Sequence, residues 1–365
     1  MRHRFHSLCP YFAMFPEEFS RKWIEHYTDE GDLVLDPFCG RGTTPFQALL
    51  SRRSAIACDI NPVAFCITRA KTNAPSPSSL RSRLTKLEKA FARNGPEGEA
   101  GELPEFFHRA FAPRTLKQIV FLRSKLRWRE SRTDCMLTAI VLGILHGEST
   151  RSPRYLSNQM PRTISTKPRY SIDYWLKRGL VAPDRDSFSL LRQQIAFRYE
   201  TPPPEGVAVV YNSDFRDLAA LAKEDRLKPV DLVVTSPPYL DVTNFEEDQW
   251  LRGWFVGGSP MPRRTRRSRD DRYRNDGSYW RLIADFWRVV GLTVRPQGHV
   301  VVRIGGKRLE PERIVRQLTE ASSFSRRRVR LVTWEVSKLR RKQTNAFRPG
   351  AQGCAEELDA CFNLG

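Results

Sequence analysis

Residues 31–44, GDLVLDPFCGRGTT, contain the pattern that decides the fold. A short apolar run ends in Asp36 and is followed at once by a loop that contains Gly40 and Gly42. In doubly wound sheets, such a loop at the carboxyl end of a strand turns tightly against a ligand before the next helix starts. The loop has no GK[ST] sequence and so does not match a P-loop, which makes phosphate binding the weaker interpretation.

Strand and helix signals alternate outward from this loop. Apolar residues at helical spacing predict helices over 16–27, 43–53 and 61–72. Short apolar runs predict strands over 31–36, 54–59, 207–211, 231–236 and 299–305. The alternation is typical of an α/β fold with a doubly wound, Rossmann-like parallel sheet, and we expect the last of these strands to complete the sheet.

The pattern changes between the two groups of strands. Pro and Ser punctuation, charged helical stretches and the polar segment 146–170 occupy residues 75–204. We expect 1–74 and 205–365 to form one domain around the sheet, with 75–204 inserted into it as a mainly helical region.

Composition limits the class of protein. The 365 residues include 61 Lys and Arg against 41 Asp and Glu, a net charge of +20. This charge attracts a polyanion, so nucleic acid is the leading partner, although an Arg-rich proteome also produces basic chains. The chain has neither an apolar run of about 18 residues that could span a bilayer nor the apolar core of a secretory signal. Seven Cys without a CxxC pair indicate reduced thiols, and we expect a cytoplasmic protein without membrane contact.

A second acidic residue, Asp59, follows the next predicted strand. An acidic residue about 20 positions after the first strand end suits hydrogen bonds to ribose hydroxyls. The alternative is that Asp59 caps the helix predicted over 61–72, and the two roles can coexist.

The segment TSPPY, residues 235–239, ends another predicted strand. Pro237 and Pro238 fix the backbone and remove two amide donors, which leaves a rigid corner rich in carbonyl oxygens. The exocyclic amino group of a base is a poor nucleophile and needs acceptors that hold it in line. Ser236 Oγ and the Pro237 carbonyl are candidate acceptors, and Tyr239 is a candidate for stacking on the base. Taken alone, two prolines after a strand also form an ordinary exit from a sheet.

Together, these segments resemble the DNA amino-methyltransferases, the family of N6-adenine and N4-cytosine enzymes. The resemblance covers about residues 5–70 and 205–305. LDPFCGRGTT resembles cofactor motif I, CDINPVA motif II, TSPPY catalytic motif IV and PYFAMFPEEF (10–19) motif X, while NSDFRDL (212–218) lies where motif III is found. The resemblance implies a methyltransferase fold, S-adenosyl-L-methionine as the cofactor and direct methyl transfer.

The resemblance also assigns site residues. Motif X packs against the methionine part of the cofactor in this family, and Asp214 would reach its adenine end. The implied catalytic residues are Ser236, Pro237, Pro238 and Tyr239. The implied cofactor-binding residues are Tyr11, Phe12, Met14, Phe15, Asp36, Pro37, Phe38, Cys39, Gly40, Gly42, Thr43, Thr44, Asp59, Ile60, Asn61, Asp214, Phe215 and Thr235.

The TSPPY segment bears on the target base. In this family, SPPY tends to mark N4-cytosine enzymes, whereas DPPY and NPPY tend to mark N6-adenine enzymes. We therefore expect a site-specific, cytosine-N4-specific methyltransferase of double-stranded DNA, with an N6-adenine enzyme as the alternative. A base in a duplex must leave the stack to reach the corner, at a cost of a few kcal/mol. An RNA guanine-N2 methyltransferase and a non-catalytic DNA-binding protein are more distant alternatives.

Two polar segments outside the motifs are candidates for DNA contact. SNQMPRT, residues 157–163, and the Arg-rich run 262–274 contribute Asn158, Gln159, Arg162, Arg263, Arg264, Arg266 and Arg267. Ordinary surface loops are the alternative for both segments. We expect no metal, because His146-Gly147-Glu148 lacks the PCxxC that accompanies HxE in zinc deaminases. A cognate restriction endonuclease that acts separately is a candidate partner.

Overall fold

The computed structural model divides into two compact units. It describes residues 2–11, 15–95, 100–147, 152–160, 167–239, 245–262, 276–306, 310–338 and 356–365. We call 1–12, 69–203 and 245–264 the helical unit, and 13–68, 204–244 and 265–365 the sheet unit. The predicted insertion, 75–204, falls within the helical unit except for its last residue. Residues 1–12 and 245–264 also group with the helical unit, whereas the sequence assigned them to the sheet domain.

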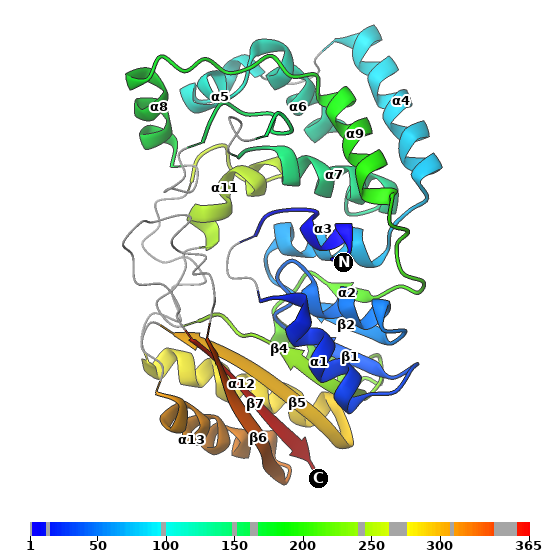
Figure 1. Ribbon diagram of the computed structural model, residues 1–365, viewed down its shortest axis with the longest axis vertical. Helices are drawn as coiled ribbons and strands as arrows, with labels where there is room; N and C mark the ends of the chain where they lie inside the picture. Colours follow the sequence, from blue (N-terminus) through cyan, green and yellow to red (C-terminus); the bar gives the residue numbers. More distant parts are fainter. Residues whose placement is uncertain are drawn as a thin grey trace. The chain divides into compact units, whose positions relative to one another are not determined.

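The sheet unit contains a seven-stranded sheet in the order β3-β2-β1-β4-β5-β7-β6 (Figure 1). The strands are β1 (Leu33–Asp36), β2 (Ser54–Cys58), β3 (Val209–Tyr211), β4 (Val230–Thr235), β5 (Val294–Gly306), β6 (Val329–Lys338) and β7 (Glu356–Leu364). Strands β1 to β5 pair in parallel, and β7 pairs antiparallel with both β5 and β6. The predicted doubly wound, methyltransferase-like α/β fold is confirmed.

The prediction that the sheet ends with residues 299–305 is wrong. Two further strands, β7 and β6, extend it beyond β5. The apolar pattern does not predict strand β7, because Glu356, Glu357 and Asp359 interrupt its apolar residues. The side chains of Glu357 and Asp359 are nevertheless buried. Burial of charged side chains is rare unless they are paired, so their place in a central strand implies a partner in the sheet.

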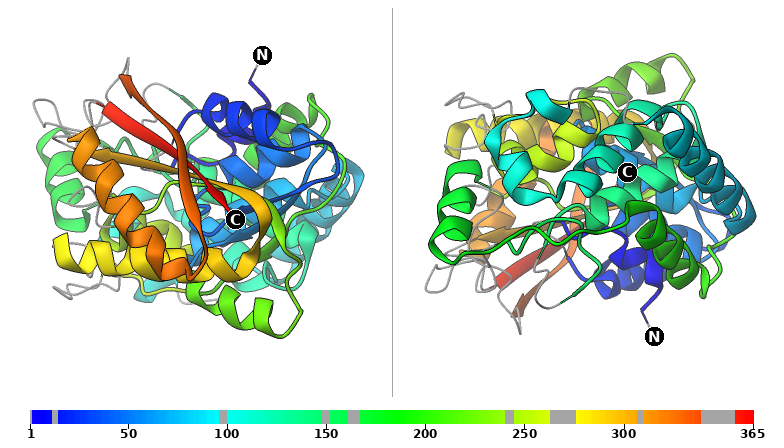
Figure 2. Two further views of the ribbon diagram at one scale, coloured as in Figure 1. Left: turned by 90° about the horizontal axis from the view of Figure 1, so that it is seen from below. Right: turned by 90° about the horizontal axis from the view of Figure 1, so that it is seen from above.

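Helices cover both faces of the sheet. They are α1 (Glu17–Tyr27), α2 (Thr43–Leu50), α10 (Leu218–Lys223), α12 (Asp276–Thr293) and α13 (Pro311–Ser322). Because side chains alternate along a strand, Val34 packs in the core with α1 and α2, while its neighbour Leu35 packs in the core with α12. Figure 2 shows α1 on one side of the sheet and α12 and α13 on the other.

Every regular element described in the helical unit is a helix, which agrees with the mainly helical character predicted for 75–204. The unit contains α4 (Pro77–Asn94), α5 (Glu105–Ala110), α6 (Pro113–Lys125), α7 (Arg132–Ile144), α8 (Pro168–Lys177), α9 (Ser187–Tyr199) and α11 (Phe245–Phe255). Helix α3 (Pro62–Thr72) contributes to both units. An ion pair between Arg83 Nε and Asp134 Oδ1, 2.7 Å apart, joins α4 to α7. Across the described residues, no helix is both long enough and apolar enough to cross a bilayer.

Candidate active site

The candidate site lies where the direction of strand order reverses in the sheet. From β1, the chain proceeds to β2 and β3 on one side, and β4 and β5 lie on the other. Strands β1 and β4 are parallel neighbours, with Leu35 opposite Val233. Their carboxyl ends are joined by a hydrogen bond in which Thr235 Oγ1 donates to Asp36 Oδ1 at 2.7 Å. The glycine loop 37–42 and the Ser236–Tyr239 corner therefore start side by side, at the position where doubly wound sheets bind ligands.

The glycine loop has the backbone that its sequence predicts. Gly40 and Gly42 both have positive φ, 50° and 72°, which only glycine adopts readily. The Gly42 amide donates to the Cys39 carbonyl at 2.7 Å and closes the turn ahead of α2. A Cβ atom on Gly42 would come within 2.6 Å of Thr68 Oγ1, so the close packing of α3 also requires glycine here. The buried Thr44 hydroxyl lies 3.1 Å from Ser20 Oγ and fixes α2 to α1.

Asp36 is a fully buried carboxyl group at the start of the loop. Its Oδ1 accepts hydrogen bonds from the Phe38 amide and from Thr235 Oγ1. Burial raises the pKa of Asp36 to about 7, against the opposing effect of the hydrogen bonds from Thr235, Phe38 and Thr44. Asp36 therefore shapes the corner between the two strand ends rather than facing solvent.

Asp59 stands at the end of β2 and organises the turn. Its Oδ2 accepts from the Gly40 amide and its Oδ1 from the Asn61 amide, each at 2.8 Å. Asn61 Oδ1 in turn accepts from the Val63 amide and so caps α3, the role that the sequence had offered for Asp59. The predicted bond of Asp59 to ribose stays a prediction.

The neighbouring strand end supplies a second carboxylate. Asp214 follows β3, caps a short 3-10 helix through the Arg216 amide, and forms an ion pair with Arg216 Nη1 at 3.0 Å. The Phe38 ring packs on Phe215 with a centroid distance of 4.7 Å. Two acceptor-rich carboxylates, Asp59 and Asp214, suit the hydroxyl and amino donors of a nucleoside and would repel a phosphate. These residues therefore fit the nucleoside part of S-adenosylmethionine.

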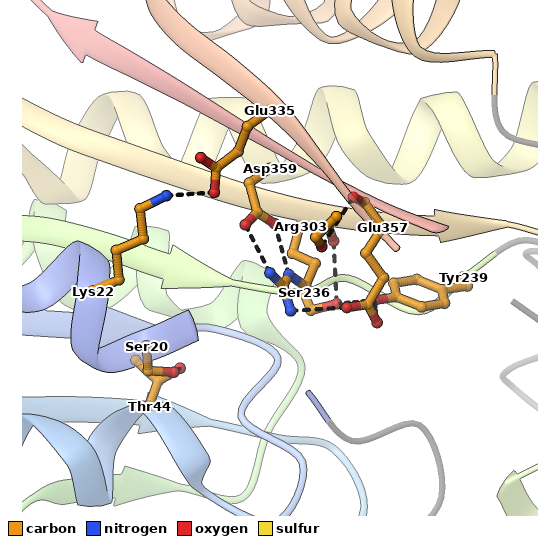
Figure 3. Close-up of polar contacts among 10 residues, drawn as sticks. Ser20, Lys22, Thr44, Ser236, Tyr239, Arg303, Glu335, Glu357 and Asp359 are labelled. Atoms are coloured by element: carbon orange, nitrogen blue, oxygen red, sulfur yellow. Dashed lines mark hydrogen bonds and ion pairs between the residues drawn. The ribbon is translucent and has the colours of Figure 1, made fainter. Parts of the chain in front are cut away.

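The Ser236–Tyr239 corner is tied to the last strands of the sheet (Figure 3). Ser236 Oγ lies 3.1 Å from Tyr239 Oη and 3.1 Å from the Arg303 carbonyl oxygen, and its single proton can be donated to either. The Tyr239 hydroxyl donates to Glu357 Oε1 at 3.2 Å. The corner is thus connected through side chains to β5 and β7, which the sequence motif did not reveal.

Three buried charges lie directly behind the corner (Figure 3). Arg303 donates to both carboxylate oxygens of Asp359, at 2.6 and 2.7 Å, and to Glu357 Oε2 at 2.8 Å. All three side chains are at most 6% exposed. The Arg303 guanidinium also lies 3.8 Å from the centroid of the Phe19 ring. We call Arg303, Glu357 and Asp359 the buried triad.

The charges of the triad do not balance. Two carboxylates surround one guanidinium, so the fully ionised triad carries one net negative charge. Burial raises the pKa of Glu357, and the like charge of Asp359 raises it further, against the opposing effects of Arg303 and the Tyr239 hydrogen bond. Glu357 is thus the member of the triad that is linked both to the buried charges and to the corner.

The other predicted site residues fall into three groups. Phe15, Pro37, Thr43 and Ile60 belong to the sheet unit, where Pro37 begins the glycine loop, Thr43 begins α2 and Ile60 lies two residues after β2. Tyr11 belongs to the helical unit. Phe12, Met14, Arg162, Arg263, Arg264, Arg266 and Arg267 lie outside the described residues.

The predicted DNA contact of Asn158 disagrees with its surroundings. Asn158 is 2% exposed, and its amide nitrogen donates to the Arg109 and Leu180 carbonyls at 3.3 and 3.1 Å. Gln159 is half-buried and donates to the Met160 carbonyl at 2.9 Å. The Asn158 amide thus connects its loop to two other segments of the helical unit, and its burial argues against contact with a base edge.

Comparison with known sequences identifies the part of the chain that carries the resemblance. Residues 3–69 match the family model described as DNA methylase. Over 49 residues, the chain is 43% identical to the orphan methyltransferase M.BamHII of Bacillus amyloliquefaciens and 45% identical to the type II methyltransferase M.MjaI of Methanocaldococcus jannaschii. Each match covers 13% of this chain, and 18% and 16% of the respective relative. The chain therefore spans less than a fifth of the length of either relative.

Solved structures with a similar fold are distant. The rRNA methyltransferase AviRa from Streptomyces viridochromogenes has 12% identity and a TM-score of 0.38, with 100% of this chain and 94% of that chain covered. TrmN from Thermus thermophilus has 11% identity and a TM-score of 0.37, with coverages of 99% and 52%. Likeness at this level says nothing about the substrate. The cofactor that the methyltransferase-like sheet and the family match indicate is S-adenosylmethionine.

Proposed function

We propose that this protein is a site-specific DNA methyltransferase that transfers the methyl group of S-adenosylmethionine to the exocyclic N4 amino group of cytosine. The observation that carries the proposal is the juxtaposition of the glycine loop and the Ser236–Tyr239 corner at the carboxyl ends of β1 and β4, joined by the Thr235–Asp36 hydrogen bond. The family match over residues 3–69 includes the loop and supports the same interpretation.

The residues of the corner account for what the chain must contribute. Bound S-adenosylmethionine supplies an electrophilic methyl group. Ser236 Oγ and the Pro237 carbonyl accept hydrogen bonds from the amino group and hold its nitrogen in line, and the Tyr239 ring stacks on the base. The amino nitrogen itself is the nucleophile, so the enzyme forms no covalent bond with the base.

Cytosine is preferred over adenine because of Ser236. In the family that the sequence resembles, a serine before the two prolines tends to mark N4-cytosine enzymes, and an aspartate or asparagine tends to mark N6-adenine enzymes. Methylation of adenine N6 by the same corner is the alternative, since both bases present an exocyclic amino group.

Double-stranded DNA is the proposed substrate, and the helical unit is the proposed target-recognition region. The helical unit contains 30 Lys and Arg against 15 Asp and Glu, whereas the sheet unit contains 31 against 26. Three-quarters of the net charge of +20 therefore belongs to the helical unit. A concentration of positive charge is the electrostatic requirement for binding a phosphate backbone. The proposal implies action on chromosomal DNA in a bacterial or archaeal cytoplasm, with or without a separate restriction endonuclease.

The decisive experiment incubates the protein with several unmethylated DNAs and S-adenosylmethionine that carries a labelled methyl group. Chromatography and mass spectrometry of the nucleosides should find labelled N4-methylcytosine. Labelled N6-methyladenine would keep the mechanism and change the base. Label in RNA with none in any DNA would overturn the DNA assignment and favour the guanine-N2 alternative.

Matched variants separate catalysis from folding. Ser236→Ala and Tyr239→Ala should abolish or strongly reduce labelling while the far-ultraviolet circular dichroism stays unchanged. Ser323→Ala is the control, because it removes an exposed hydroxyl of the same unit, remote in sequence from the corner. Full labelling by both corner variants would show that the corner does not carry the catalysis, whereas cellular effects left intact in both variants would favour a DNA-binding protein without catalysis.

A further inference from the structure

A continuous chain of hydroxyl groups runs from the catalytic corner into the sheet. Ser236 Oγ donates to Tyr239 Oη at 3.1 Å, and Tyr239 Oη donates to Glu357 Oε1 at 3.2 Å (Figure 3). Each hydroxyl can donate one proton while it accepts another, so a proton that enters at Ser236 can leave at Glu357. The Glu357 carboxyl group is the first group along this chain that can retain the proton.

The charge of the buried triad favours proton uptake. Arg303 binds Asp359 through two parallel hydrogen bonds, which leaves the Glu357 carboxylate as the excess negative charge. One proton on Glu357 would make the triad neutral. Glu357 is 5% exposed, so water does not stabilise its charged form well. Burial also raises the pKa of Glu357, in agreement with this charge count.

The described residues that pair with Glu357 across the sheet, Gly305 of β5 and Ser337 of β6, are uncharged. Across β6, Ser337 is the partner of Glu357 in the strand register and donates its hydroxyl to the Glu357 carbonyl. A charged pair on that side, Glu335 of β6 with Lys22 of α1, is nearly half exposed and internally balanced. Among the described residues, the groups that shift the pKa of Glu357 are Arg303, Tyr239 and Asp359.

Methylation of an exocyclic amino group releases one proton. The hydroxyl chain offers a path along which this proton can leave the amino nitrogen. We propose that Glu357 accepts this proton through Tyr239 and Ser236, and this inference rests on the proposed function. As the nitrogen bonds to the methyl group, the bond between that methyl group and the sulfur of S-adenosylmethionine breaks with its electron pair left on sulfur, and the excess proton of the nitrogen passes to Ser236 Oγ. The Ser236 proton passes to Tyr239 Oη, and the Tyr239 proton passes to Glu357 Oε1. The carboxylate becomes a neutral carboxylic acid. Each of the two hydroxyl groups gives up one proton and receives another, so both remain protonated.

This assignment makes Glu357 a positioning and proton-accepting residue that acts through Tyr239. A purely structural counterion for Arg303 is the simpler role for the same carboxylate. The two roles differ in their dependence on pH, because a proton acceptor must be ionised at the start of each turnover. The rate of methyl transfer should fall as the pH drops below the pKa of Glu357, which lies above its ordinary value of 4.5.

The test is single-turnover methyl transfer to DNA, measured from pH 5 to pH 9 in the full chain. Glu357→Gln should lower the rate constant at neutral pH by about 10²-fold, the lower end of general base effects, and should remove the fall in rate on the acidic side. Glu357→Asp should recover part of the rate and keep the acidic fall. The Kd for S-adenosylmethionine, measured by calorimetry, should stay unchanged in both variants.

A second variant keeps the test valid if Glu357→Gln is poorly folded. Tyr239→Phe retains the stacking ring and removes the hydroxyl of the chain, so it should produce a similar loss of rate. The double variant should be no slower than either single variant, because both changes interrupt one relay. Glu335→Gln is the matched control, since it removes a half-exposed carboxylate from the adjacent strand and should leave the rate unchanged.

A measurement without turnover completes the test. In protein with carbon-13 in its glutamate carboxyl groups, the Glu357 signal is identified by its loss in Glu357→Gln. Tyr239→Phe should raise the pKa of that signal, because the Tyr239 hydrogen bond favours the carboxylate. Wild-type rates and an unaltered pH profile in Glu357→Gln, with an active wild type, would overturn the relay alone. An absence of methyl transfer to any DNA by the wild type would overturn the proposed function and the relay with it.

Discussion

At the scale of single residues, Arg303 is the side chain on which the buried triad depends. Its guanidinium neutralises Asp359 and part of the charge of Glu357 inside the sheet. Arg303→Met would keep most of the packing against Phe19 and leave two carboxylates without a cation. Because removal of one partner from a buried ion pair leaves an uncompensated charge, we expect the free energy of unfolding in urea to drop by about 3–5 kcal/mol at pH 8.

The matched control for Arg303 is Lys22. Lys22 forms an ion pair with Glu335 at the surface, and both side chains are nearly half exposed. Lys22→Met should change the free energy of unfolding by no more than about 1 kcal/mol, since water screens such pairs. Equal losses in the two variants would mean that the triad is hydrated in solution.

Ionisation of Asp36 should contribute measurably to the pH dependence of the free energy of unfolding. Its pKa of about 7 in the folded protein lies above its ordinary value of 3.8, so the folded protein binds this proton more tightly than the unfolded chain. The stabilising contribution is therefore complete below about pH 4 and is lost as the pH rises through 7. Between pH 5 and pH 8, the free energy of unfolding of the wild type should fall by about 2–3 kcal/mol more than that of Asp36→Asn.

Chemical denaturation at a series of pH values tests this expectation. The Asn side chain keeps an oxygen that can accept from Thr235 and Phe38, so the comparison isolates the ionisation of residue 36. Other titrating groups contribute equally to the two proteins and cancel in the difference. Parallel curves would show that Asp36 is already ionised in the folded protein at pH 5.

At the scale of elements, the turn between β1 and α2 has two requirements that can be tested separately. Gly42 has positive φ and also faces Thr68, whereas Gly31 has positive φ of 92° with nothing within 4 Å of an added Cβ. Gly31→Ala should therefore cost only the backbone strain, about 1–2 kcal/mol of stability, and leave cofactor binding intact. Gly42→Ala should in addition displace the loop and raise the Kd for S-adenosylmethionine at least about tenfold, or 1.4 kcal/mol.

Calorimetric titration of both variants with S-adenosylmethionine distinguishes strain from displacement. Gly42→Ala combined with Thr68→Ala relieves the contact and should recover most of the binding, because the nearest atoms to the added Cβ belong to the Thr68 side chain. Equal Kd values for Gly31→Ala and Gly42→Ala would indicate that the loop does not contact the cofactor.

Strands and turns that are defined by residues close together in the sequence could be predicted from it. Strands β1, β2 and β4 are apolar on both faces, and the loop and corner at their ends have distinctive Gly and Pro residues, so their positions followed from the pattern. Strand β7 could not be recognised in the same way, because the partner that makes Glu357 and Asp359 compatible with burial is Arg303, more than 50 residues away. The isolated Arg303 within the apolar run 299–305 was the available signal, since a buried arginine requires an anionic partner.

The candidate site shows the same limit. Its glycine loop and TSPPY segment follow from sequence, but their connection to Glu357 depends on the order of strands β4, β5 and β7 in the sheet. Asn158 illustrates the opposite case. A polar loop residue looked suited to reading bases, yet its amide satisfies two carbonyl groups of its own unit.

At the scale of the whole molecule, charge is distributed unequally between the two units. The helical unit carries a net charge of +15 and the sheet unit +5. Helix α4 presents the exposed cations Arg81, Lys89 and Arg93 at intervals of eight and four residues, which places them on one face of the helix. We expect this face to contact DNA phosphates, so that reversal of the three charges to Glu weakens DNA binding regardless of sequence.

The test measures the Kd for a DNA duplex at several salt concentrations. Each phosphate contact contributes about 0.9 to the slope of log K against log salt, so loss of the three contacts should lower the slope by about 2–3. The control reverses three exposed cations of the sheet unit to Glu, namely Arg316, Arg326 and Arg328. Because both triple variants change the net charge by the same amount, a general effect of charge would alter the two slopes equally, whereas DNA contact by α4 alters only the first.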